Sequence, residues 1–301
     1  MLSFLPPTLR GVIAFILLVV NTLFWCCLLF VLSPLKYLLG RRLDPLLNRI
    51  ATAWVACNSG WMALTQRTRW DVQGVDQLSG KDWYLVNANH QSWVDIFVLQ
   101  HCLNRRIPLL KFFLKHELIY VPVIGLAWWA LDFPFMKRHG RTELRRNPEL
   151  RNQDRETARQ ACAKFARTPT SVMNFAEGTR FTADKHQTQA SPYRHLLKPK
   201  SGALAMTLDV MGESFRSLLD ATIVYPGGVP SFWQFLCGTA PEVVLRVQQQ
   251  PIPPELLHGN YEQDSAFRRQ FHRWVAAIWE AKDQQIEALL AERAGTAQGP
   301  A

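Results

Sequence analysis

The stretch Trp83-Tyr84-Leu85-Val86-Asn87-Ala88-Asn89-His90-Gln91-Ser92-Trp93-Val94-Asp95 decides the fold class of this chain. Residues 83–86 form an apolar run bounded by Gly80 and Asn87, which is typical of a short buried strand. A helix is expected to begin near Ser92, directly after the turn that ends this strand. The stretch therefore predicts a strand–turn–helix unit with an imidazole in the turn and a carboxylate in the first turn of the helix.

Apolar runs alternate with helical stretches along the rest of the chain. The expected strands are residues 107–113, 133–136, 171–175, 221–225 and 243–247. The expected helices are residues 154–167, residues 201–211 and a C-terminal amphipathic helix whose apolar face holds Phe267, Phe271, Trp274 and Ile278. That face suits contact with the core or with a membrane. The alternation predicts an α/β fold with a mixed, largely parallel sheet flanked by helices.

Composition and charge restrict the class of protein. The chain has 301 residues, of which 48% are hydrophobic and 19% are charged, and this excludes a disordered chain and a polytopic transporter. The net charge of +10 fits an acidic partner, such as a phospholipid surface, a phosphorylated cofactor or an acidic carrier protein. Nucleic acid is the least favoured partner, because no binding fingerprint appears and the basic residues are dispersed. The six cysteines have no metal-ligand spacing, so we expect reduced thiols and no metal site.

An uncharged segment near the N-terminus predicts a membrane helix. No charged residue lies between Arg10 and Lys36, and about 20 apolar helical residues cross a bilayer core. We expect a span over about residues 11–33. Basic residues are more frequent after this segment than before it, which favours a cytoplasmic location for the rest of the chain. Residues 50–64 fit either a re-entrant or interfacial helix or a helix packed on the core.

His90 is the candidate general base. The histidine side chain can accept a proton at neutral pH and return it, because an unperturbed imidazole has a pKa near ~6.5. Asp95, five residues later, is placed to orient the ring if a helix begins near Ser92. A structural hydrogen bond would normally be the preferred interpretation of such a pair. Its position after a strand end favours a functional site instead.

A second polar element follows the expected strand 171–175. Arg180 is the candidate phosphate ligand, because a guanidinium group offers two parallel donors to phosphate oxygens. Gly178 permits a tight turn and Thr179 adds a hydroxyl donor, whereas Glu177 is assigned to holding the loop or a substrate hydroxyl. Taken without the His90 pair, these four residues are equally consistent with an ordinary polar turn.

Together these motifs resemble those of the lysophospholipid acyltransferase family, specifically the 1-acylglycerol-3-phosphate acyltransferases. The first family block, Asn-His followed by four residues and Asp, is matched by Asn89, His90 and Asp95. The block Phe-x-Glu-Gly-Thr-Arg is matched in full by residues 175–180. Looser matches are Gly125 to Arg138, which ends in Lys137 and Arg138, the proline block 223–226, and Lys198 to Ala203. Residues 193–203 and the aromatic C-terminal segment are similar to a bacterial inner-membrane paralogue described as a probable acyltransferase.

The resemblance implies a reaction and its participants. His90 would take the proton from the free hydroxyl of a lysophospholipid, which attacks the thioester of acyl-CoA or acyl carrier protein. Arg180, with Arg138 or Lys137, would hold the acceptor phosphate. Lys111 and Lys115 are candidates for phosphates on the thioester side, and surface-exposed lysines are equally plausible. No bound cofactor is implied, and the expected location is a bacterial inner membrane with the catalytic domain facing the cytoplasm.

This resemblance also suggests how the chain is divided. Residues 1–65 would form the membrane anchor and an interfacial helix, residues 66–240 the acyltransferase domain, and residues 241–301 a C-terminal extension with an amphipathic helix. Two other functions stay open: a coenzyme-independent transacylase or lysophospholipase with the same His90 and Asp95, and a non-catalytic lipid-binding membrane protein. The absence of a Gly-x-Ser-x-Gly element argues against a serine hydrolase.

Overall fold

The computed structural model describes residues 2, 4–133, 135–136, 156–157, 159–160, 163, 168–257 and 259–297. The helices are α1 (Pro7–Leu32), α2 (Lys36–Leu39), α3 (Asp44–Thr65), α4 (Val94–Leu103), α5 (Ile124–Ala130), α8 (Ala183–Gln189), α9 (Gly202–Met211), α10 (Phe232–Leu236) and α11 (Ser265–Ala297). The strands are β1 (Arg69–Gln73), β2 (Tyr84–Ala88), β3 (Leu110–Phe112), β4 (Leu114–Lys115), β5 (Phe135–Met136), β6 (Ser171–Phe175), β7 (Ser217–Val224) and β8 (Glu242–Gln250). Short 3₁₀ helices are Ser33–Leu35, Gly40–Leu43, His116–Tyr120, Gly212–Ser214 and Pro254–Leu256.

The described strands form a six-stranded sheet in the order β1-β8-β7-β2-β6-β3. All neighbouring pairs are parallel except β7 and β8, which run antiparallel. The prediction of a mixed, largely parallel sheet is therefore confirmed. Strands β2 and β7 are buried along their whole length because helices cover both faces of the sheet. The register aligns the carboxyl end of β2, at Ala88, with Phe175 of β6 and Ala221 of β7.

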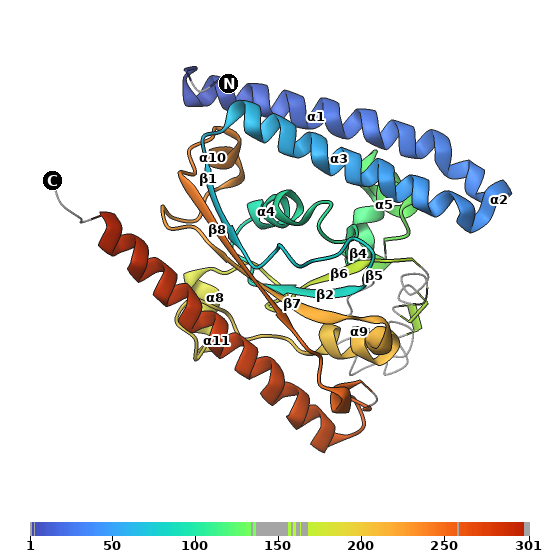
Figure 1. The fold of residues 1–301 in the computed structure, drawn as a ribbon, viewed down its shortest axis with the longest axis vertical. Helices are drawn as coiled ribbons and strands as arrows, with labels where there is room; N and C mark the ends of the chain where they lie inside the picture. The colour runs from blue at the N-terminus through green and yellow to red at the C-terminus, as the bar shows by residue number, and fades with distance from the viewer. Residues whose placement is uncertain are drawn as a thin grey trace.

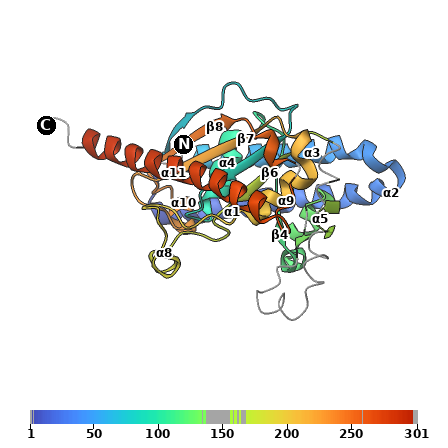
Figure 2. The same ribbon diagram turned by 90° about the horizontal axis from the view of Figure 1, so that it is seen from below.

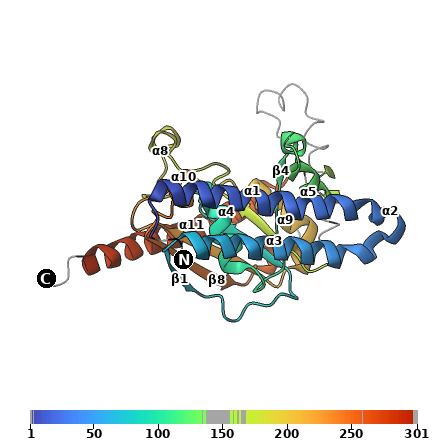
Figure 3. The same ribbon diagram turned by 90° about the horizontal axis from the view of Figure 1, so that it is seen from above.

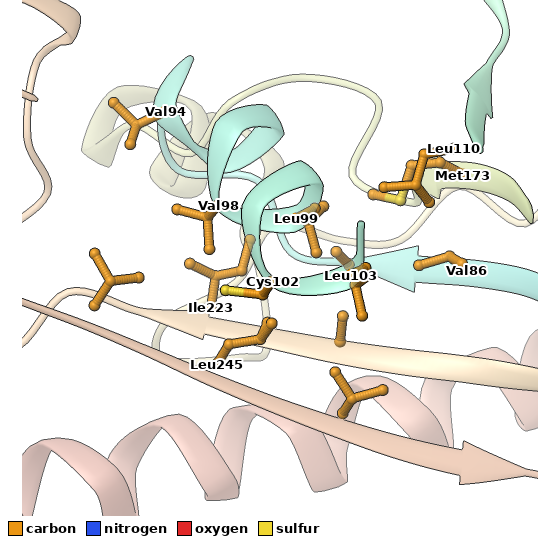
Figure 4. Close-up of a cluster of buried hydrophobic side chains, with 14 of the residues drawn as sticks. Val86, Val94, Val98, Leu99, Cys102, Leu103, Leu110, Met173, Ile223 and Leu245 are labelled. Carbon is orange, nitrogen blue, oxygen red and sulfur yellow. The ribbon is translucent and has the colours of Figure 1, made fainter. Parts of the chain in front are cut away.

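One face of the sheet is covered first by α4 and then by α3 and α1 (Figures 1 and 4). The buried side chains of α4 lie on those of β2, β6, β7 and β8, as Figure 4 shows for Val98, Leu99, Cys102 and Leu103 on α4 and for Val86, Met173, Ile223 and Leu245 on the strands. Burial of one such aliphatic side chain stabilises a fold by about 1.5–3 kcal/mol. This packing fixes the start of α4 over the carboxyl ends of β2, β6 and β7.

The opposite face of the sheet is covered by α9 and α11 (Figures 1 and 2). The side chains of Phe271, Val275 and Trp279 on α11 are fully buried in this second cluster. The expected apolar face of the C-terminal helix is therefore a core contact. Strand β8, which begins just after residue 240, lies between β1 and β7 in the sheet. The expected division of the chain at residue 240 stays a prediction.

The N-terminal helices α1 and α3 lie side by side, with α1 outermost (Figures 1 and 3). Near its start, α1 approaches α10 so closely that a Cβ on Gly11 would lie 2.6 Å from Cys237 Sγ. Residues 50–64 belong to α3, whose Trp61 and Met62 are buried in the main core, which agrees with the interpretation of a core-packed helix. By length and composition, α1 with the following turn is the one helix among the described residues that could cross a membrane.

Several elements differ from the expectations. Strand β1 was not expected, because its sequence Arg69-Trp70-Asp71-Val72-Gln73 contains too many polar residues to form a recognisable apolar run. Such a composition is common in an edge strand, and β1 lies at the edge of the sheet. The run 107–113 yields only the three-residue β3. Residues 135–136 pair with β4 in a separate small sheet and do not extend the main one. The expected helix 154–167 lies largely outside the described residues.

Candidate active site

The His90 and Asp95 side chains meet where β2 ends and α4 begins. Their Nδ1 and Oδ2 atoms are 2.8 Å apart. Asp95 lies in the first turn of α4, and its Oδ2 also accepts hydrogen bonds from the backbone N–H groups of Gln91 and Ser92, at 2.6 and 2.9 Å. The start of a helix favours a carboxylate because its first N–H groups lack partners within the helix. The turn sequence thus builds the pair locally.

Tyr225, just after β7, completes the environment of Asp95. Its hydroxyl donates to Asp95 Oδ1 at 2.6 Å, and Asp95 is fully buried. Burial, followed by the Asp95 charge, raises the pKa of Tyr225 well above its ordinary value, so the hydroxyl stays a donor at neutral pH. Both carboxylate oxygens are therefore satisfied inside the protein, which offsets the penalty for burying the charge.

The imidazole of His90 is held in one orientation. It stacks on the ring of Phe175 with centroids 3.9 Å apart and an interplanar angle of 15°. Since Asp95 accepts from Nδ1, the neutral ring presents Nε2 as its proton acceptor. No described residue bonds Nε2, and the side chain is 13% exposed. The arrangement suits a general base that waits for a hydroxyl group.

Asn89 ties the same turn to the neighbouring strand. Its side-chain Nδ2 donates to the carbonyl of Ile223 at 2.9 Å, and its Oδ1 accepts from the N–H of Ile223 at 2.8 Å. The buried amide continues the backbone ladder between β2 and β7 by one step. This explains why a residue directly before His90 is an asparagine and why His90 leaves the sheet at a defined place.

Glu177 holds two loops by their backbones. Its Oε1 accepts from the N–H of His90 at 2.9 Å, and its Oε2 accepts from the N–H of Leu197 at 3.2 Å. The residue is fully buried, and burial raises the pKa of its carboxyl to about 7. Of the two roles expected for Glu177, the geometry favours holding the loop. The N–H of Phe181 also donates to the His90 carbonyl at 2.7 Å, so this loop holds His90 on both sides.

Gly178, Thr179 and Arg180 form the outer part of that loop. Gly178 has a φ of +67°, a left-handed conformation that glycine adopts without strain. The Arg180 guanidinium lies 4.6 Å from the ring centre of Trp93. Lys185 donates to Thr179 Oγ1 at 2.9 Å and to the Arg180 carbonyl at 3.0 Å. The loop and the first turn of α8 therefore bring two cations together beside the His90 turn.

Sequence reasoning missed three residues of this arrangement. Trp93 lies within residues 83–95, and a large aromatic residue at the start of the predicted helix was a signal that could have identified it. Its side chain is 57% exposed. Lys185 and Tyr225 carry no local signal, because only the fold brings them to the site. Tyr225 lies inside the looser proline block 223–226, but nothing in the sequence connects its hydroxyl to Asp95.

Of the remaining expected ligands, Lys111 is not part of this cluster. Lys111 is buried and lines a separate cavity of about 190 Å³ together with Lys36, Asp44 and Asp132. It lies on β3 opposite Val172, near the amino end of β6, whereas His90 and Glu177 follow the carboxyl ends of their strands. Lys137 and Arg138 lie outside the described residues.

A family model, Acyltransferase, matches residues 69–228, which contain the whole of this site. The chain belongs to the acyltransferase family. It is therefore an enzyme that transfers acyl groups to oxygen, and the resemblance drawn from the two motifs is confirmed. The first motif residue, Asn89, and the last, Arg180, both lie well inside the matched segment.

Among similar proteins, the 1-acyl-sn-glycerol-3-phosphate acyltransferase delta of Rattus norvegicus is 26% identical over 279 residues, covering 85% of this chain and 70% of that protein. The gamma form of Homo sapiens is 24% identical over 280 residues, covering 88% and 68%. The crystal structure of the 1-acyl-sn-glycerophosphate acyltransferase of Thermotoga maritima matches with a TM-score of 0.56 at 18% identity, covering 93% of this chain and 95% of that one. The expected fold of this acyltransferase is thereby confirmed.

Proposed function

We propose that this acyltransferase moves an acyl chain from a thioester, acyl-CoA or acyl carrier protein, to the free hydroxyl of 1-acylglycerol-3-phosphate, which yields phosphatidic acid. The observation that carries the proposal is the 2.8 Å contact between His90 Nδ1 and Asp95 Oδ2, which directs the other ring nitrogen outward as a base. The names of the similar proteins support this acceptor. No acyl-enzyme intermediate is required.

The reaction proceeds by direct attack. His90 Nε2 takes the proton of the acceptor hydroxyl as its oxygen bonds to the thioester carbon. Asp95 stabilises the imidazolium ion that forms, and it accepts hydrogen bonds from Tyr225 and from the backbone N–H groups of Gln91 and Ser92. The tetrahedral intermediate then breaks its carbon–sulfur bond, and the proton on His90 passes to the departing thiolate. Proton transfer of this kind typically contributes about 10²–10⁴ in rate.

The acceptor phosphate is assigned to Arg180. Its guanidinium offers bidentate donors, and its position over Trp93 places it beside the His90 turn. Lys185 of α8 adds a second positive charge next to this loop, and Thr179 adds a hydroxyl. Lys137 and Arg138 remain proposed ligands of the same phosphate. Lys111, in its separate cavity with two carboxylates, is not assigned to the substrate.

Membrane association follows from the outer surface of α1. Ile16, Val20 and Phe24 recur at helical spacing and are 53, 58 and 61% exposed. α5 contacts α1 and exposes Leu126 and Trp129. We propose that this surface binds the bilayer that supplies the lysophospholipid. The proposed location is the inner membrane of a bacterium, with the catalytic domain on the cytoplasmic side.

The test is acyl transfer from labelled oleoyl-CoA to lysophosphatidic acid by the detergent-solubilised wild type and His90→Ala. Labelled phosphatidic acid from the wild type alone supports the proposal. Equal product from both proteins would refute the base. A matched reaction with acyl carrier protein distinguishes the donors, and a reaction without thioester detects transacylase or lysophospholipase activity. Product with another lysolipid but none with lysophosphatidic acid would refute the proposed acceptor.

A further inference from the structure

A second cavity lies at the C-terminal end of α4, whereas the active site is built at the start of this helix. The cavity has a volume of about 630 Å³, which is in the range of small-molecule sites, about 300–1,000 Å³. At 1.5 Å per residue, α4 spans about 15 Å, so the two sites are separate. The residues that carry the argument are Ser59 of α3, Trp70 of β1, and His101, Arg105 and Arg106 at the end of α4.

The side chains around this cavity give it a positive charge. Arg105 and Arg106 both line it, and none of the described residues that line it is an aspartate or a glutamate. Arg105 has a φ of +66°, a left-handed conformation that is costly for any residue other than glycine. The turn is held in this form because the N–H groups of Arg106 and Ile107 both donate to the carbonyl of Leu103, at 3.0 and 3.2 Å. The turn thereby brings two adjacent cations to the cavity.

The fold itself uses only part of this charge. The Arg106 guanidinium donates to the carbonyl of Cys102, one of the last carbonyls of α4, which lack partners within the helix. A guanidinium group has five N–H donors, so Arg106 keeps donors for a ligand. No described residue forms a hydrogen bond or an ion pair with the Arg105 side chain, and both arginines are exposed. A structural role at the end of α4 therefore accounts for one hydrogen bond of Arg106 and does not account for Arg105.

The remaining wall of the cavity is neutral and partly aromatic. His101 Nδ1 lies 2.8 Å from Ser59 Oγ, and the centre of its ring lies 4.4 Å from that of Trp70. Burial, followed by the Arg106 charge, lowers the pKa of His101, so the ring is uncharged at neutral pH. Its Nε2 has no hydrogen-bond partner in the described part of the chain. This wall can therefore offer a hydrogen bond and an aromatic contact to an uncharged part of a ligand.

We propose that this cavity is a second binding site, in which Arg105 and Arg106 bind the phosphate group of a phosphomonoester and the rest of the ligand lies against Trp70 and His101. A phosphomonoester fits two guanidinium groups better than a carboxylate does, because it has nearly two negative charges and three strong acceptor oxygens. A soluble phosphorylated metabolite and the headgroup of an anionic lipid share this chemistry. The site does not depend on the proposed acyl transfer, because that reaction takes place at the other end of α4.

The first experiment measures binding of phenyl phosphate, a soluble phosphomonoester with a flat ring, by titration calorimetry of the detergent-solubilised full chain. All proteins carry Arg180→Ala, which weakens the proposed acceptor site. Arg105→Gln combined with Arg106→Gln should raise the Kd by about tenfold or more, because charged hydrogen bonds to the phosphate are lost. Arg69→Gln is the matched control, since Arg69 precedes Trp70 on β1 but does not line the cavity. An unchanged Kd in the double variant, or an equal increase in the control, would overturn the proposal.

A second measurement keeps both arginines, so it does not depend on the folding of the double variant. Nitrogen-15 NMR of labelled histidine rings follows His101 and His90 in the Arg180→Ala protein, with His101→Gln and His90→Ala identifying the two signals. Phenyl phosphate should shift the His101 signal. A shift at His90 alone would place the phosphate in the active site and would refute the second site, as would the absence of any shift. Phenol tests the role of the phosphate, and an equal His101 shift with phenol would likewise refute the proposal.

The source of the phosphate is identified by repeating both titrations with dihexanoyl phosphatidic acid, a short-chain lipid. Tighter binding of this lipid than of phenyl phosphate supports a lipid headgroup as the ligand, and weaker binding supports a soluble organic phosphate. If neither compound binds, no phosphate site exists here. None of these readouts requires turnover, so a failure of the proposed acyl transfer is recognised separately.

Discussion

The hydroxyl of Tyr225 donates to Asp95 Oδ1 at 2.6 Å, while His90 occupies the other oxygen of the same carboxylate. Tyr225 and Asp95 are 130 residues apart in the chain and are both buried. The tyrosine therefore neutralises part of the burial penalty that a lone carboxylate would meet, and it leaves Asp95 able to orient the imidazole.

Replacement of this tyrosine by phenylalanine removes one donor and leaves Asp95 Oδ1 without it. We expect Tyr225→Phe to lower the free energy of unfolding by about 2 kcal/mol, since a buried hydrogen bond to a charged group is worth about 1.5–3 kcal/mol. Melting in detergent measures this loss, and kcat should fall with little change in the acceptor KM. Tyr120→Phe, at a side chain that is 77% exposed, is the control. An unaltered melting temperature for Tyr225→Phe would show that the hydrogen bond contributes nothing.

His90 and Asp95 are expected to act as one unit. His90→Ala and Asp95→Ala should each lower kcat by about 10²–10⁴-fold, because either change removes an oriented neutral base. The double variant should be no slower than His90→Ala, since residues that work through one another have non-additive effects. Rates of phosphatidic acid formation for the four proteins decide this. Multiplicative losses would mean that Asp95 has a separate role.

Arg180→Ala should weaken binding of the acceptor and leave folding unchanged. The lost guanidinium–phosphate hydrogen bonds, at about 1.5–3 kcal/mol, predict an increase in the acceptor KM of roughly tenfold or more. Arg180→Lys should restore part of the affinity, because a lysine keeps the charge but lacks the bidentate geometry. Arg216→Ala is the control, since Arg216 precedes β7 at the opposite end of the strand from the site. An acceptor KM that stays at the wild-type value in Arg180→Ala would refute this assignment.

Glu177 is expected to make stability depend on pH. Its pKa is raised from 4.5 to about 7 by burial, so the folded chain binds a proton more tightly than the unfolded chain does. The stabilisation from this group is complete below about pH 4.5 and is lost as the pH rises through about 7. At 1.36 kcal/mol per pH unit, the loss is roughly 3 kcal/mol.

The Glu177→Gln variant has no titratable group at this position, so comparing it with the wild type tests whether Glu177 causes the pH dependence of stability. The melting temperature of the wild type relative to Glu177→Gln should decrease between pH 5 and pH 8 in the same detergent. The direction of the change is diagnostic, because a carboxylate with a lowered pKa would give the opposite slope. Parallel pH profiles for the two proteins would mean that Glu177 has an ordinary pKa in the folded state.

The exposed surface of α1 should bind membranes. Ile16→Asp and Val20→Asp each replace an exposed apolar side chain, which would enter the bilayer, with a charged one. The fraction of protein bound to phospholipid vesicles in a flotation assay should therefore fall several-fold. Thr188→Asp, at an exposed position on α8, controls for the added negative charge. Unchanged flotation of the α1 variants would place the membrane contact elsewhere.

Local patterns determined much of this protein. The apolar runs at residues 83–86 and 171–175 predicted the strands β2 and β6, which are buried because helices cover both faces of the sheet. The predicted helix near Ser92 is α4, and the Asp95 carboxylate lies in its first turn. The meeting of His90 and Asp95 follows from this spacing alone. Strand β1 was not predicted, because an edge strand contains polar residues that hide the apolar pattern of a buried strand.

Only the tertiary structure decided which distant residues serve the site. Tyr225 and Lys185 carry no local signal, because hydrogen bonds and ion pairs join side chains through space without regard to sequence separation. The parallel register placed Glu177 against the backbone of His90. The sequence by itself determined the two motifs and the elements that carry them. The packing of α4 and α11 on opposite faces of the sheet determined how those motifs meet, because burial fixes the helices and the helices fix the loops.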